Sequence, residues 1–278
     1  MSIDTSIRAK RTSAVYEGGA ELLNWLNWML DASASDWISA NTDYELQRKI
    51  GDECRTLIEA AYDQSNSDAL ASMHQILSFI YEYDFSSASL QSVDLETQPI
   101  LRSISAILEG GIMKNQLALI RVEELKAYPI TGAAYVQWLK KLISAHTSSI
   151  HPLYNQYLAN EASKEDLAFF LAQETNLDPR FDDILAMLQI GLHGIEKMEL
   201  ACNYFDEMGN GNVENVHTVL FSRALEELNV DISYIRSNMM LEAQASGNIS
   251  ACLAMSRRHY YKAIGYFGVT EYLAPRRF

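Results

Sequence analysis

The amino-acid sequence predicts an all-α protein. Glycine (13) and proline (5) are scarce among the 278 residues, so few positions favour tight turns. No regular series of short alternating runs indicates β-strands. Apolar residues instead recur at helical spacing along most of the chain. We therefore expect helices joined by short connections.

The N-terminal part of the chain predicts three amphipathic helices. They are expected over about residues 13–30, 43–62 and 68–83, each with one apolar stripe. Helices of this length can form a small helical unit or a docking face. Residues 1–130 contain no motif of their own, so we expect an accessory helical region.

The middle of the chain is predicted to remain helical. One helix is expected over 100–128, with Gly110-Gly111 as a kink or break, and a second over 133–146. Ser163 is placed to cap a third, with Asp166 three residues later as a variant of the capping box.

A long helix is predicted to start at Asp178-Pro179 and to run to Glu207, where Gly209 and Gly211 end it. Another begins immediately, from Val216 to Leu228. Two more are expected over about 232–240 and 249–273.

Composition excludes several classes of function. The net charge of −14 and the pI near 4.8 argue against nucleic-acid binding and against an anionic membrane surface. No apolar run reaches the roughly 18 residues of a membrane span. Three widely spaced cysteines, Cys54, Cys202 and Cys252, indicate neither a disulfide framework nor a cysteine-based zinc site. We expect a cytoplasmic protein.

Glu207 and His217 form the most specific chemical pattern in the sequence. The glycine turn between their two helices is short enough to bring the carboxylate and the imidazole together. Glu174 follows an apolar run and is expected to be partly buried. Two carboxylates and one imidazole suit iron or manganese in a helical bundle. The alternative is a solvated acidic turn beside an ordinary histidine.

Three stretches resemble a known family. They are Leu167 to Glu174; Glu199 to Gly211 together with His217; and Tyr260 to Glu271. Over about residues 133–278 the chain is similar to the haem-oxygenase-like diiron oxidases and oxygenases, often labelled iron-containing redox enzymes. The order of the residues, the glycine turn and the Glu-x9-His spacing all agree with the family.

The resemblance implies a haem-oxygenase-like helical bundle over residues 131–278. We expect residues 1–130 to be an N-terminal helical extension and the assembly to be a homodimer. It implies non-haem iron, two ions in the complete site, with Glu174, Glu207 and His217 as ligands. Such enzymes use O2 to oxidise a small molecule, by N-oxygenation or by oxidative C–C cleavage of an amine, amino acid or fatty acid. The family's further His-x3-Asp-x2-His ligands are absent from this sequence. We therefore expect the last helices of the bundle to be missing from this chain.

Two alternatives remain. A haem-binding member of the same fold would use His146 or His151 as axial ligand, with Gly191-x-x-Gly194 opening the distal side. A degenerate, metal-poor helical module would bind a partner protein instead of iron.

Overall fold

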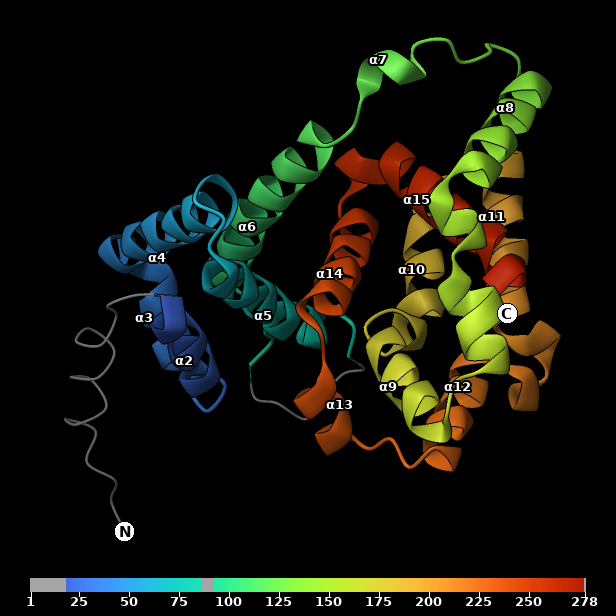
Figure 1. Ribbon diagram of the computed structural model, residues 1–278. Helices are drawn as coiled ribbons and strands as arrows, with labels where there is room; N and C mark the ends of the chain where they lie inside the picture. Colours follow the sequence, from blue (N-terminus) through green and yellow to red (C-terminus); the bar gives the residue numbers. More distant parts are fainter. Residues whose placement is uncertain (1–18, 87–92, 278) are drawn as a thin grey trace. The chain divides into compact units, whose positions relative to one another are not determined.

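A computed structural model of the chain describes residues 19–86 and 93–277. These residues form helices and connections without a β-strand, so the predicted all-α class is confirmed (Figure 1). The chain divides into two compact units, Met1–Ile120 and Arg121–Phe278, and each is described by itself. The predicted accessory role of residues 1–130 stays a prediction.

The first unit contains the helices α2 (Gly19–Met29), α3 (Ala34–Thr42), α4 (Tyr44–Ile58), α5 (Ser67–Asp84) and α6 (Pro99–Ala118). A π-helical turn, Glu59–Asp63, extends α4. Sequence patterning missed α3, which begins at a capping box formed by Ser33 and Asp36. Apolar side chains from these helices form the core, among them Leu22, Leu26, Ile50, Met73, Ile76, Leu77, Ile104 and Leu108.

The expected break at Gly110-Gly111 is wrong, because α6 is continuous through both glycines. A Cβ atom on Gly111 would lie 2.7–2.9 Å from side-chain atoms of Ile58. Gly111 therefore permits close approach of α6 to α4. Gly111 thus serves helix packing rather than a turn.

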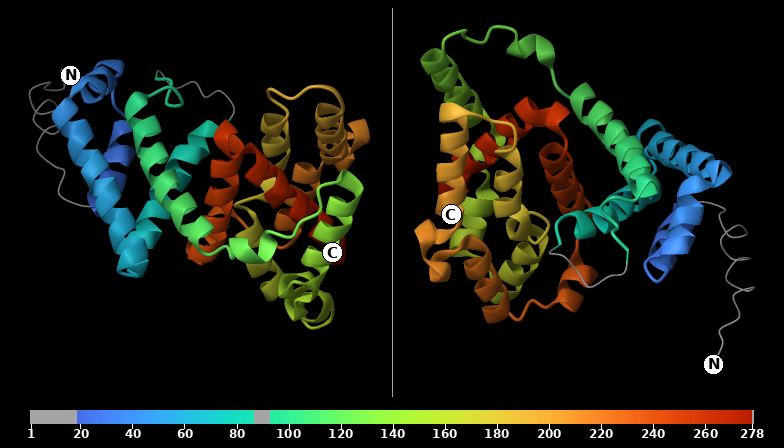
Figure 2. Two further views of the ribbon diagram at one scale, coloured as in Figure 1. Left: turned by 90° about the horizontal axis from the view of Figure 1, so that it is seen from above. Right: turned by 180° about the vertical axis from the view of Figure 1, so that it is seen from behind.

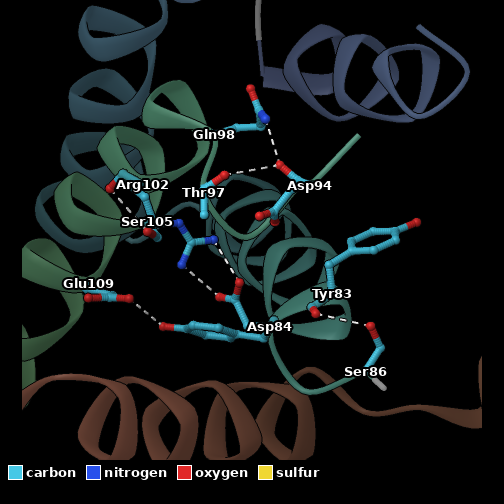
Figure 3. A network of polar contacts seen from close by, with 10 residues as sticks. Tyr83, Asp84, Ser86, Asp94, Thr97, Gln98, Arg102, Ser105 and Glu109 are labelled. Atoms are coloured by element: carbon cyan, nitrogen blue, oxygen red, sulfur yellow. Dashed lines mark hydrogen bonds and ion pairs between the residues drawn. The ribbon is translucent and has the colours of Figure 1, made fainter. Parts of the chain in front are cut away.

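A buried polar network joins α5 to α6 (Figure 3). Arg102 donates two hydrogen bonds of 2.9 Å to the carboxylate of Asp84, whose side chain is fully buried. Tyr81 donates to Glu109 at 2.8 Å. Such bidentate geometry fixes the register of the two helices.

The second unit contains α7 (Val122–Leu125), α8 (Gly132–Ala145), α9 (Lys164–Glu174), α10 (Phe181–Leu188), α11 (Gly194–Glu207), α12 (His217–Glu227), α13 (Ile232–Asn238), α14 (Leu241–Met255) and α15 (Tyr260–Arg277). Short 3₁₀ or π turns fall at Thr147–Ile150, Leu153–Leu158, Asp178–Arg180, Gly209–Gly211, Val213–Asn215 and Arg257–His259. The predicted capping box of Ser163 and Asp166 is confirmed at the start of α9.

Two predicted long helices are each divided. The helix expected from Asp178 to Glu207 is interrupted between α10 and α11, where Gly191 (φ 85°) and Gly194 (φ 59°) are left-handed. The two helices run antiparallel and side by side (Figure 2). The helix expected over 249–273 is interrupted at Ser256, between α14 and α15. Each interruption lets a bundle helix reverse direction.

The packing of the second unit brings four segments to the end of α11. Helix α10 packs against α11, and α12 packs against the turn Asp178–Arg180. Helix α15 reaches α11 through Glu271, whose side chain accepts a hydrogen bond from Asn203.

Candidate metal centre

Glu207 is the buried acid at the end of α11. Its side chain is only 8 % exposed, and its Oε2 lies 2.5 Å from Nδ1 of His217, which donates a hydrogen bond to it. Burial raises the pKa of Glu207, and the imidazole opposes that rise. The predicted approach of carboxylate and imidazole is present in the structure.

Gly209 makes this approach possible. Its φ of 61° is left-handed, and a Cβ there would lie 2.6 Å from the carbonyl carbon of Asn215 and 2.7 Å from the nitrogen of Val216. The chain after α11 therefore folds back so tightly that only glycine fits beside the residues before His217. Asn212 supports the turn, because its side chain accepts a hydrogen bond from the N–H of Glu214.

His217 is the first residue of α12, and its side chain is 59 % exposed. Solvent and small ligands therefore reach the ring, while its Nδ1 is held by a buried acid.

Further carboxylates surround this pair. Asp178 comes from the turn that packs on α12, and burial raises its pKa to about 6, partly offset by His217. Glu271 of α15 accepts a hydrogen bond from the side chain of Asn203, and burial raises its pKa too. Asp182 raises the pKa of Glu207 further. Concentrated, partly buried negative charge of this kind is stabilised by a cation.

The structure does not unite all three predicted ligands. Glu174 is the half-buried last residue of α9, and its backbone carbonyl accepts a hydrogen bond from Leu177. Over residues 19–86 and 93–277, no three His, Cys, Asp or Glu side chains lie close enough to hold a metal ion together. Glu207 and His217 are brought together, whereas the role of Glu174 stays a prediction.

The side chains around Glu207 fit iron by their chemistry. Carboxylate oxygens and an imidazole nitrogen are ligands for Fe(II) and Mn(II), whereas structural zinc sites are mainly built from cysteine and histidine. The two buried cysteines, Cys54 and Cys252, and the exposed Cys202 have no part in this pair.

The histidines of the haem alternative cap short helical segments. Nδ1 of His146 accepts a hydrogen bond from the N–H of Ser148 at 3.2 Å. Nδ1 of His151 accepts one from Leu153, also at 3.2 Å. Both side chains lie on the surface, where they satisfy backbone groups.

Sequence reasoning missed Asp178 as a neighbour of the site, because Asp178-Pro179 was interpreted only as a helix start. The one signal available was the acid itself, placed four residues after Glu174. Glu271 lies far along the sequence from Glu207. No local pattern links the two residues.

The described residues of the second unit thus form an all-α bundle in which a buried carboxylate, Glu207, contacts an exposed imidazole, His217. Residues 168–278 match the family model described as "Iron-containing redox enzyme". The match confirms the resemblance over these residues, and with the helical fold it supports the haem-oxygenase-like class and an iron-dependent redox function. No curated protein and no solved structure shows significant similarity to the chain. Within its described part, no helix has the length and apolarity needed to cross a membrane.

Proposed function

We propose that the second unit belongs to an oxidase or oxygenase that uses O2 at a non-haem iron site to oxidise a small molecule. Glu207, His217 and Glu174 are the proposed iron ligands. The observation on which the proposal rests is the 2.5 Å contact between the buried Glu207 and His217. It lies inside the segment that matches the iron-containing redox enzymes.

Each residue of the pair has a defined part. Glu207 supplies a carboxylate that its burial shields from water, and His217 supplies an imidazole open to solvent. Gly209 fixes the distance between them. Iron bound there would supply one-electron chemistry with O2, which amino-acid side chains alone do not provide. A second iron would need ligands beyond these three, and the sequence has no His-x3-Asp-x2-His motif.

The surroundings favour a cationic substrate. Asp178, Asp182 and Glu271 add negative charge beside the pair, and the chain has a net charge of −14. Such a field attracts an amine and repels the carboxylate of a fatty acid. Among the reactions of the family, we favour oxidation of an amine.

Fe(II) titration under anaerobic conditions tests the proposed ligands. We expect His217→Ala and Glu207→Gln each to weaken Fe(II) binding at least about tenfold, because each removes a ligand. His193→Ala is the matched control, since His193 is an exposed histidine that makes no side-chain capping bond at the start of α11. Equal affinity in wild type, His217→Ala and Glu207→Gln would refute the proposal.

A metal-poor interaction module is the rival function. The exposed apolar side chains Ile195, Met198 and Phe205 of α11 favour it, because such a stripe suits a protein partner. Wild-type protein that stays folded, binds no Fe(II) and shows no thermal shift with it would support this function.

We also propose that the protein acts as a cytoplasmic homodimer. The same exposed stripe on α11 supports the dimer, and the wide spacing of Cys54, Cys202 and Cys252 in the sequence supports the cytoplasm. Light scattering of the purified chain would test the assembly, and a mass equal to one chain would refute the dimer.

A further inference from the structure

Helix α8 carries an apolar stripe that faces solvent. Tyr135, Trp138 and Leu142 follow one another at intervals of three and four residues, so their side chains lie on one face of the helix. Tyr135 is 41 % and Leu142 is 44 % exposed, and the rings of Tyr135 and Trp138 pack together with 5.5 Å between their centroids. The buried residue of α8, Ile143, lies to one side of this stripe. An exposed stripe of this length indicates a binding surface.

Helix α11 carries a second stripe of the same kind. Its exposed residues Ile195, Met198 and Phe205 also follow a helical spacing, and the exposed Cys202 lies within the stripe. The three apolar side chains are between 52 % and 71 % exposed. Both helices have 14 residues, so each is about 21 Å long and the two match in length. Rows of side chains with this spacing are those along which two helices pack.

The charges beside the two stripes are opposite. Between Glu124 and Glu161 the sequence has no Asp or Glu, although the whole chain has 36 of them. Lys141 lies beside the α8 stripe and is exposed. Glu199 and Asp206, both exposed, follow one side of the α11 stripe. Packing either helix against a copy of itself would bring like charges together, whereas α8 against α11 joins a lysine to carboxylates.

The occupant of each stripe is best supplied by a second copy of the chain. Within one chain both stripes are exposed, so α8 and α11 do not cover each other. A second copy brings both helices at once. A two-fold axis then repeats the contact, with α8 on the partner's α11 and α11 on the partner's α8. All four stripes are covered in this way.

We propose that two copies of the chain form a two-fold dimer in which α8 of each subunit packs against α11 of the other. This inference rests on the homodimer put forward with the proposed function, and it names the surfaces that form it. On α11 the stripe and Glu207 lie on opposite faces of the helix. The contact can therefore be altered without altering the proposed iron ligand.

Disulfide cross-linking tests the contact, because Cys202 is exposed whereas Cys54 and Cys252 are buried. We expect Tyr135→Cys or Leu142→Cys to form a covalent dimer through Cys202 under mild oxidation, seen on a non-reducing gel. Cys202 is close to the middle of its stripe, so one of the two positions lies near it whether the helices run parallel or antiparallel. Adding Cys202→Ser to either variant should abolish the covalent dimer.

Gln137→Cys is the matched control, since Gln137 is exposed and lies on the opposite side of α8 from the stripe. It should form little covalent dimer, as should wild type. Strong cross-linking of wild type through Cys202 would mean that α11 packs against α11, which overturns the proposed pairing. Equal cross-linking of Gln137→Cys, or no cross-linking of either stripe variant, would overturn it too.

Light scattering separates this inference from the proposed function. We expect Met198→Asp to raise the dissociation constant of the dimer at least about tenfold, because a charge would be buried in the contact, and to leave Fe(II) affinity unchanged. If wild type is a dimer that Met198→Asp does not weaken, the pairing is refuted and the homodimer stands. If wild type has the mass of one chain, both are refuted. Fe(II) titration of His217→Ala and Glu207→Gln then decides the proposed iron site by itself.

Discussion

In the described part of the first unit, Asp84 is the ion-paired residue with the least exposed side chain. Its side chain has no exposed surface, and Arg102 holds it with two hydrogen bonds. Removing one partner of a buried pair leaves the other charge uncompensated. The pair therefore makes the packing of α5 on α6 sensitive to a single substitution.

We expect Asp84→Asn to lower the free energy of unfolding by about 1.5–3 kcal/mol, because charge-assisted hydrogen bonds are lost while the half-exposed Arg102 keeps access to water. Urea denaturation of the whole chain measures this loss. Asp52→Asn is the control, because Asp52 pairs with Arg48 and Arg55 on the surface, where such a loss stays within about 1 kcal/mol. Equal effects of the two substitutions would contradict the role given to burial.

His74 makes the first unit sensitive to acid. It is 2 % exposed, and burial lowers its pKa to about 4, against 6.5 for the unperturbed side chain. The unfolded chain therefore binds the proton more readily than the folded chain. Stability is complete above about pH 6.5 and falls as the pH drops towards 4, by up to about 3 kcal/mol.

His74→Gln should flatten this part of the pH profile of stability, as measured by urea denaturation between pH 4 and pH 7. His151→Gln, which alters an exposed histidine, should leave the profile unchanged. If His74→Gln keeps the full wild-type slope, another group causes it.

At the scale of elements, the turn between α11 and α12 determines the geometry of the candidate site. We expect Gly209→Ala to destabilise the protein by about 2–4 kcal/mol, because the methyl group would meet the backbone of Asn215 and Val216 at a left-handed φ. It should also weaken Fe(II) binding, because it moves His217 away from Glu207.

Gly265→Ala is the control for that substitution. Gly265 lies inside α15, and a Cβ there would have no neighbour within 4 Å. Alanine should raise the free energy of unfolding by about 0.5–1 kcal/mol. If Gly209→Ala were as stable as Gly265→Ala, the close approach at Gly209 would not exist in solution.

The elements that the sequence predicts well are those with local causes. The capping box of Ser163 and the glycine stop after Glu207 depend on residues within a few positions, and both occur as predicted. The break expected at Gly110-Gly111 is wrong, because Gly111 permits a close contact with Ile58 of another helix, α4. A glycine pattern alone does not distinguish a turn from a close helix contact.

In the candidate site, too, some contacts have a local cause in the sequence and others depend on tertiary packing. The approach of Glu207 to His217 follows from one short turn, so their spacing predicts it. Asp178 and Glu271 reach the pair through the packing of α12 and α15, which no local pattern encodes. Tertiary contacts thus place the surrounding charge.

At the scale of the molecule, the second unit contains both the candidate site and the family match. Residues 168–278 match the iron-containing redox enzymes, and Glu207, His217 and Glu271 all lie within them. The first unit has its own core and its own buried ion pair. Its part in the function stays a prediction.

Iron content per chain tests the central proposal most directly. Wild type and Glu207→Ala are loaded with Fe(II) without oxygen, freed of excess metal and analysed by mass spectrometry. We predict at least one iron per wild-type chain and a near-complete loss in the variant. Two irons, both lost, would mean that residues not assigned here complete a diiron site. Little iron in wild type, or equal iron in both proteins, would contradict an iron site at Glu207 and His217.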